Sequence, residues 1–108
     1  METITLHHLE SRNYWMVKVS ILTGISTDAI MSRKRTSEIS EARHLVSWAL
    51  NTFEKIPVNL IAILLRRDFR SINYAIRKIE NYNSINNKDI YNIKNQLKTI
   101  YYEERKNP

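Results

Sequence analysis

Glycine and proline are almost absent from this chain. Its 108 residues include one glycine, Gly24, and two prolines, of which Pro108 is the last residue. A β architecture needs these residues at regular intervals for its turns, whereas helices need them only near their ends. We therefore expect an all-α fold, a compact bundle of about five to six helices. Because a chain of this length has room for one core, residues 1–108 should form a single domain.

The spacing of apolar residues predicts where the first two helices lie. The first begins near Ser11 and ends at Gly24, because glycine readily adopts the left-handed conformation that follows a helix. Ser26 or Thr27 can cap a short second helix over residues 28–32. The apolar positions of the first helix lie three and four residues apart and include Trp15, Val19 and Leu22.

A polar connector over residues 33–39 leads into a third helix that we expect to be the centre of the core. Ser40 can cap this helix, because a serine oxygen accepts the free N–H groups of a first turn. An apolar stripe with a helical period then continues to Phe53. The other members of that stripe are Ala42, Leu45, Val46, Ala49 and Leu50.

Two further segments follow Pro57, which suits the first turn of a helix. Residues 58–65 are so apolar that they must be nearly buried, as a helix or, alternatively, as a short strand. Asp68 then caps a helix that continues to about Tyr82. The inward positions of this helix follow the i, i+3, i+4, i+7 pattern and are Ile72, Ala75, Ile76 and Ile79.

An asparagine-rich loop over residues 81–87 precedes an extra C-terminal helix over about 87–105. Its apolar stripe either packs on the core or pairs with a partner protein, in which case the chain is an adaptor without enzymatic activity. The members of the stripe are Ile90, Ile93, Leu97 and Ile100. No apolar run approaches the roughly 20 residues that a membrane-spanning helix needs, so we expect no membrane partner.

The positive charge is concentrated in two places. The chain carries a formal net charge of +6, and the segments 33–35 and 66–78 hold more positive charge than that, so the remainder is slightly negative. A basic cluster is often only a solvated surface, but concentration of the whole net charge points to a polyanionic partner. The basic residues are Arg33, Lys34 and Arg35 in the first segment and Arg66, Arg67, Arg70, Arg77 and Lys78 in the second.

Residues 57–82 have the pattern of a helix-turn-helix unit: an apolar helix, a short turn, and a helix with one polar face. The second helix of such a unit lies in the major groove, and its N-terminal residues reach base edges. The chain would then be a sequence-specific reader of double-stranded DNA. Its candidate contacts on the polar face are Asn73, Tyr74, Arg77 and Lys78, besides the residues at the tip of the helix.

The tip of this helix carries side chains with base-reading chemistry. Arg70 can pair with guanine through two hydrogen bonds, Phe69 can contact a thymine methyl group, and Ser71 can pair with either donor or acceptor. Asp68 can accept from cytosine, although capping the helix is an equal alternative. Phe69 and Tyr74 could instead be packing residues. Arg66 and Arg67 precede the helix, where contact with phosphate is natural.

Two motifs resemble a known family. They are Ser32-Arg33-Lys34-Arg35 with an arginine in the next helix, and Arg67-Asp68-Phe69-Arg70-Ser71-Ile72 followed by Ala75-Ile76-Arg77-Lys78-Ile79. Over about residues 15–80, within a core of about 15–82, this order is similar to the C-terminal DNA-binding domain, domain IV, of the bacterial replication initiator DnaA, a Trp-repressor-like fold. Phe69 stands where that family has histidine, Arg70 where it has threonine, and its glycine pair is absent.

The resemblance implies a role for individual residues. Arg35 would enter the minor groove, and Lys34 and Arg43 would contact phosphates. Asp68 and Ser71 would read bases in the major groove, and Arg67 matches the basic position of the signature. It also implies a role in replication initiation or its regulation, with transcriptional regulation as the alternative. A single copy reads only a short site, so a homodimer or a larger replication or transcription complex is expected.

Other classes of function find little support in the sequence. A phosphate-binding Gly-x-x-x-x-Gly-Lys motif cannot exist in a chain with one glycine, so the initiator's ATPase module is missing. There is no cysteine, His7 and His8 lie in an N-terminus that we expect to fray, and His44 stands alone. We therefore expect no enzyme, cofactor or metal site, and a cytoplasmic, nucleoid-associated protein.

Overall fold

Helix α3 (Ser37–Thr52) forms the centre of the molecule. It contacts α1 (Leu6–Thr23), α2 (Thr27–Met31), α4 (Val58–Leu65) and α5 (Phe69–Asn81). Along most of its length its side chains are buried, including Trp48, Leu45 and Leu50. This confirms the expectation that the third helix is the centre of the core.

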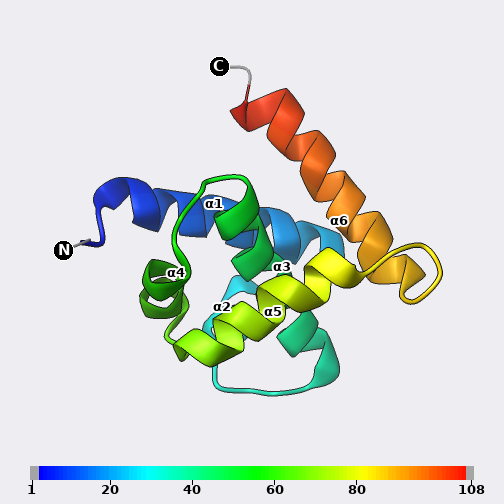
Figure 1. Ribbon diagram of the computed structural model, residues 1–108, viewed down its shortest axis with the longest axis horizontal. Coiled ribbons are helices and arrows are strands. Elements are labelled where there is room, and N and C mark those ends of the chain that lie inside the picture. The colour runs from blue at the N-terminus through cyan, green and yellow to red at the C-terminus, as the bar shows by residue number, and fades with distance from the viewer. Residues whose placement is uncertain (1–2, 107–108) are drawn as a thin grey trace.

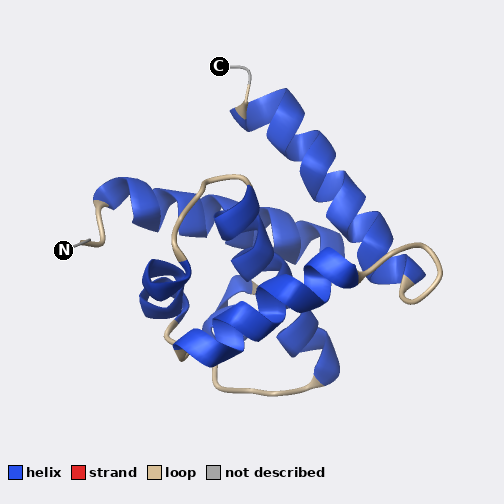
Figure 2. Ribbon diagram, viewed as in Figure 1, coloured by secondary structure: helices blue, strands red, loops and turns tan. Residues whose placement is uncertain are grey.

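The computed structural model describes residues 3–106. Within this range the chain is all-α, with six α-helices, a closing π-helical turn and no strand (Figures 1 and 2). The last two elements are α6 (Lys88–Ile100) and η1 (Tyr101–Arg105). The expected all-α bundle of five to six helices is therefore confirmed. No helix in the described part of the chain is both long and apolar enough to cross a membrane.

The end of α1 and the start of α2 lie where the sequence predicts them. Gly24 follows α1 in the left-handed conformation, with φ of 77°, and its N–H donates to the Ser20 carbonyl. The Ser26 side chain caps α2 by accepting from the Ala29 N–H at 3.1 Å. The start of α1 near Ser11, however, was placed too late.

Helix α1 begins at Leu6 because Thr5, which precedes it, and His8, in its first turn, form a reciprocal cap. Thr5 Oγ1 accepts from the His8 N–H at 3.3 Å, and His8 Nδ1 accepts from the Thr5 N–H at 3.0 Å. The expectation that His7 and His8 lie in a frayed N-terminus is therefore wrong. A histidine at the third helical position here plays the part that glutamate or glutamine usually plays in such a box.

Helix α3 also begins earlier than the sequence pattern indicated. Thr36, and not Ser40, is the N-cap, and its side chain accepts from the Ile39 N–H at 3.3 Å. Both residue types are good caps, but the earlier start brings Ile39 onto the buried face of the helix. The polar connector is correspondingly shorter than the predicted range 33–39.

Residues 58–65 form a helix, so the alternative of a strand is excluded. Pro57 precedes the helix as its N-cap residue, and most of the helix is buried, with Ile63 exposed. Asp68 caps α5, as predicted, and the four predicted inward positions of this helix are all buried. The turn between the two helices is only three residues long, Arg66 to Asp68.

The C-terminal helix closes the core and does not offer its apolar stripe to a partner. Ile90 and Leu97 are buried, and Ile93 and Ile100 pack against the core. An ion pair then links the turn η1 to the α3–α4 connection, since Arg105 Nη2 lies 2.8 Å from Glu54 Oε2.

Two tryptophans pack against one phenylalanine in the core. The ring centroids of Trp15 and Trp48 each lie 5.0 Å from that of Phe53, and Tyr101 stacks on the same ring at 4.6 Å. The Trp15 Nε1–H donates to Glu54 Oε2 at 2.8 Å. This aromatic cluster joins α1, α3 and the C-terminal turn.

Candidate nucleic-acid interface

The turn between α4 and α5 is held by backbone hydrogen bonds. Arg66 takes the left-handed conformation, with φ of 55°, and the Arg67 N–H donates to the Ala62 carbonyl at 2.9 Å. An arginine thus occupies a backbone position that normally favours glycine. The geometry ends α4 sharply and starts α5 in a new direction (Figure 1).

Asp68 acts as the N-cap of α5. Its Oδ1 accepts from the Ser71 N–H at 2.8 Å, and the Ser71 hydroxyl donates to Oδ2 at 3.3 Å. The Ser71 N–H bond is the main reason that the pKa of Asp68 lies below its usual value. The structural alternative for Asp68 is therefore confirmed, and base reading by Asp68 or Ser71 stays a prediction.

The polar face of α5 is open to solvent. Arg70 and Arg77 are exposed, Phe69 is 53% and Tyr74 60% exposed, whereas Asn73 and Lys78 are half-buried. Because Phe69 and Tyr74 expose more than half of their surface, neither ring is a core residue.

Tyr74 is nevertheless fixed from one side. Its ring meets the ring of His44 edge to face at 6.0 Å, and Lys78 Nζ lies 5.7 Å from its centroid. Burial, and then the charges of Lys78 and Arg43, lower the pKa of His44 to about 4. His44 is thus neutral at neutral pH and supports Tyr74 on the surface of α5.

The connection between α2 and α3 forms a basic loop, which we define as residues 32–36. Arg33, Lys34 and Arg35 are all exposed on it. In Figure 1 the loop passes below the N-terminal half of α5. Because Arg67 also donates to the carbonyl of Ser32, two stretches of positive charge that are about thirty residues apart in sequence lie next to each other.

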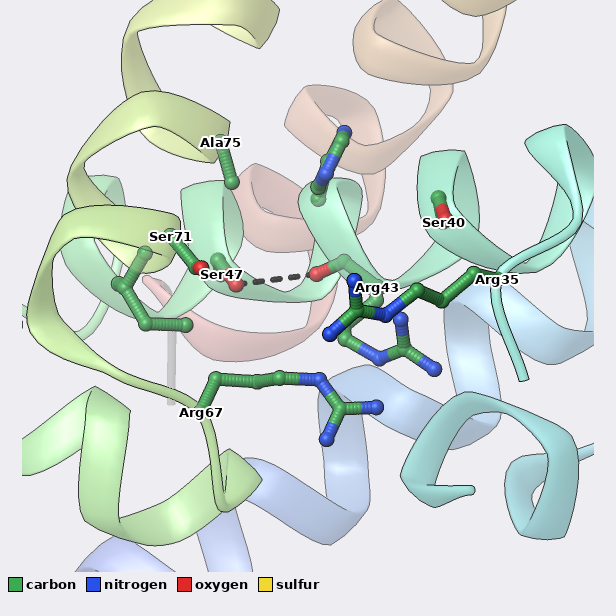
Figure 3. Close-up of a pocket in the computed structure, with 9 residues that line it drawn as sticks. Arg35, Ser40, Arg43, Ser47, Arg67, Ser71 and Ala75 are labelled. Carbon is green, nitrogen blue, oxygen red and sulfur yellow. Dashed lines mark hydrogen bonds between the residues drawn. The ribbon is translucent and has the colours of Figure 1, made fainter. Parts of the chain in front are cut away.

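Two adjoining hollows lie where the basic loop meets α5. The first, of about 170 Å³, is lined by Arg35, Arg43 and Arg67, with serine hydroxyls and His44 around them. Figure 3 shows the three guanidinium groups turned toward one another. The second, of about 310 Å³, is lined by Arg33, Arg35, Arg66 and Arg67 together with Asp68 and Ser71. We call these five arginines the arginine cluster: Arg33, Arg35, Arg43, Arg66 and Arg67.

The arginine cluster carries its charge without a carboxylate bound to it. The ion pairs among residues 3–106 are Lys18 with Glu104 and Arg105 with Glu54, and neither includes a member of the cluster. Burial lowers the pKa of Arg43 and of Arg67, and the neighbouring arginines lower both pKa values further. Like charges that are held together and not neutralised provide a binding site for an anion.

Arg43, to which the resemblance assigns a phosphate contact, is almost buried. Its side chain is only 6% exposed, and its Nε donates to the Ile30 carbonyl at 2.8 Å. Its Nη2 donates to the carbonyls of Ser32 and Lys34, at 2.9 and 3.2 Å. Phosphate contact by Arg43 stays a prediction, and the structure adds that this guanidinium already donates to the backbone of the basic loop.

The structure brings most of the predicted residues to one surface, but not all of them to one site. Arg70, Tyr74 and Arg77 follow the outer face of α5 and do not line the two hollows. Sequence reasoning missed Ser47 and His44, which line the first hollow from α3. No local signal distinguishes these two residues from other core positions of the third helix.

The histidines and acidic residues in the part of the chain that the structure describes do not gather into a metal site. No group of three histidine, cysteine, aspartate or glutamate residues lies close enough together there to hold a metal ion. His7 and His8 belong to α1, whereas His44 lies on α3 against α5.

Comparison with known proteins gives this chain no family. No protein-family model matches it, and no curated protein is significantly similar to it in sequence. The resemblance to the initiator's DNA-binding domain therefore stays a prediction.

Proposed function

We propose that this protein binds double-stranded DNA in a sequence-selective manner, with α5 in the major groove and the basic loop on the adjacent backbone and minor groove. The observation that carries the proposal is the arginine cluster beside the N-terminus of α5, which no carboxylate of residues 3–106 neutralises through an ion pair. A phosphate backbone supplies the missing negative charge in a regular array.

The chemistry of the cluster suits phosphate in particular. Guanidinium groups are planar and present several N–H donors, so they bind phosphate oxygens through paired hydrogen bonds. Arg33, Arg35 and Arg66 present such donors at the rim of the hollows, and Lys34 adds a point charge beside them. These contacts would set affinity and register, because phosphates carry no sequence information themselves.

Helix α5 has the length and the surface of a groove-binding helix. Its 13 residues extend about 20 Å at roughly 1.5 Å per residue, and its inner face is already used by the core. The outer face presents Arg70, which can read guanine, and Phe69, which can contact the thymine methyl group. Arg77 and Lys78, further along the helix, would contact the backbone on leaving the groove.

The resemblance stated from the sequence extends this proposal to replication initiation or its regulation. Because the residues at the tip of α5 differ from the family signature, the target sequence need not be the family's own. A transcriptional regulator using the same surface is the alternative. A protein of this kind would act on the nucleoid, without enzymatic activity of its own, as a homodimer or within a larger complex, since one copy covers a short site.

The proposal is tested by measuring binding to a labelled duplex at several salt concentrations. We expect log Kd to depend linearly on log salt, with a slope magnitude of about 0.9 for each phosphate contacted. The substitution R66A should flatten the slope, whereas K98A, at an exposed lysine on α6, should not. Undetectable or salt-independent binding at low salt contradicts the proposal.

Selection of bound duplexes from a random pool then tests sequence preference. An enriched motif is expected with the wild-type protein, and R70A should change the motif at a guanine position. An origin-box-like motif would favour the replication function over the transcriptional one. If no motif is enriched although binding depends on salt, the protein binds DNA without reading its sequence.

A further inference from the structure

Two arginines from different parts of the chain converge on one backbone carbonyl. The carbonyl of Ser32, at the start of the basic loop, accepts from Arg43 Nη2 at 2.9 Å and also from Arg67 Nη2. Arg43 belongs to α3, and Arg67 belongs to the turn before α5. We call these two arginines and the Ser32 carbonyl the Ser32 junction (Figure 3 shows the two side chains).

Arg43 hydrogen-bonds to the first part of the basic loop and to the end of α2. It donates to Ile30, which lies in α2, and to Ser32 and Lys34, which lie in the loop. The guanidinium lies almost out of solvent, with the side chain 6% exposed. Such bonds from a charged donor are stronger than those between neutral groups, and they leave the loop fewer conformations.

Arg67 connects the same loop to the DNA-reading helix. It lies one residue before the N-cap of α5, in a turn whose backbone is itself hydrogen-bonded to α4. Because its side chain reaches across to the Ser32 carbonyl, the basic loop and the start of α5 share a direct link.

We propose that Arg43 and Arg67 are positioning residues, and that the Ser32 junction fixes Arg35 on the basic loop relative to Arg70 on α5. This inference rests on the proposed DNA-binding function. Arg35 and Arg70, which would contact DNA in different grooves, then keep a fixed position relative to each other. Because the loop is already ordered in the free protein, it loses little conformational entropy when the complex forms. Arg43 serves DNA through the loop and not through its own phosphate contact.

The test is a double-mutant cycle between Arg43 and Arg35. We expect R43Q to weaken binding to the selected duplex about tenfold when Arg35 is present. In the R35A background it should weaken binding less than twofold, because the residue that it positions is gone. The salt slope separates the two roles, since loss of a direct phosphate contact lowers the slope by about 0.9 in either background.

A measurement on the free protein does not depend on DNA at all. In the wild-type protein we expect NMR backbone order parameters of about 0.85 for residues 33–35, as in rigid backbone. In R43Q they should fall to about 0.6, the range of a flexible loop. The matched control is K94Q, because Lys94 is also buried and also donates to a backbone carbonyl, that of Glu80, at 3.1 Å. K94Q should leave residues 33–35 unchanged.

The outcomes separate this inference from the proposed function. Equal losses from R43Q in both backgrounds, or an unchanged loop in the NMR measurement, overturn the inference while DNA binding stands. If the wild-type protein binds no duplex, the proposed function fails, and the order parameters alone still decide whether the junction holds the loop. Should R43Q fail to fold, R67A, at a more exposed member of the junction, takes its place in both measurements.

Discussion

The left-handed backbone of Arg66 allows stability and DNA affinity to be separated. With φ of 55°, this residue costs the folded state about 1–2 kcal/mol relative to an ordinary conformation. Glycine avoids that cost, but its greater conformational freedom in the unfolded chain destabilises the folded state by about 0.5–1 kcal/mol. We expect R66G to stabilise the fold by about 0.5–1 kcal/mol, which raises Tm by roughly 2–5 °C for a domain of this size.

The same substitution should weaken DNA binding. Arg66 lines the second hollow and is exposed there, so its loss removes one cation from the arginine cluster. The slope of log Kd against log salt should fall in magnitude by about 0.9. R66A removes the same charge but keeps a side chain in the left-handed conformation, so it should lose the affinity without gaining the stability.

Thermal unfolding followed by circular dichroism gives the stability, and fluorescence anisotropy gives the affinity. The chain offers a matched control in Lys55, which also has a left-handed backbone, with φ of 57°, and lies in the α3–α4 connection away from the basic loop (Figure 1). K55G should gain stability and keep its DNA affinity. A lower Tm for R66G, or an affinity loss for K55G equal to that of R66G, refutes the reasoning.

Three further predictions concern the fold. G24A should lower the free energy of unfolding by about 1 kcal/mol, because φ of 77° is strained for alanine although no atom lies within 4 Å of the added carbon. A lower Tm would show this loss. E54Q should lower the free energy of unfolding by about 1–3 kcal/mol, because it breaks the ion pair with Arg105. The glutamine oxygen can still accept from Trp15. Urea unfolding measures the loss. His44 has its folded pKa lowered to about 4, below its usual 6.5, so the unfolded chain binds the proton first and stability falls as pH drops from 6.5 to 4. H44Q should remove that part of the pH dependence, and equal pH dependence in both proteins would contradict the assignment.

Local chemistry was enough to predict much of the fold and part of the candidate site. Gly24 and Asp68 mark helix ends because their conformation or side chain satisfies backbone groups within a few residues. The inner face of α5 follows from spacing alone, and its outer face, including Arg70, was predicted with it. These features depend on neighbours in sequence, so the sequence contains the information.

The remaining features depend on contacts between distant segments. Nothing near Arg43 in the sequence indicates that its guanidinium binds the carbonyls of the basic loop, since that follows from how α2 packs on α3. Thr36 and Ser40 are equally good caps in isolation, and packing of Ile39 decides between them. The meeting of the two basic segments likewise requires the loop to pass beneath α5.

The aromatic cluster around Phe53 has a spectroscopic consequence. Both tryptophans of the chain, Trp15 and Trp48, are buried in that cluster, and neither lines the two hollows beside α5. Tryptophan emission should therefore change greatly when the core opens and hardly at all when a ligand occupies the arginine cluster. Unfolding can thus be followed in the presence of a bound duplex without a label, whereas binding requires a reporter on the ligand or near Tyr74.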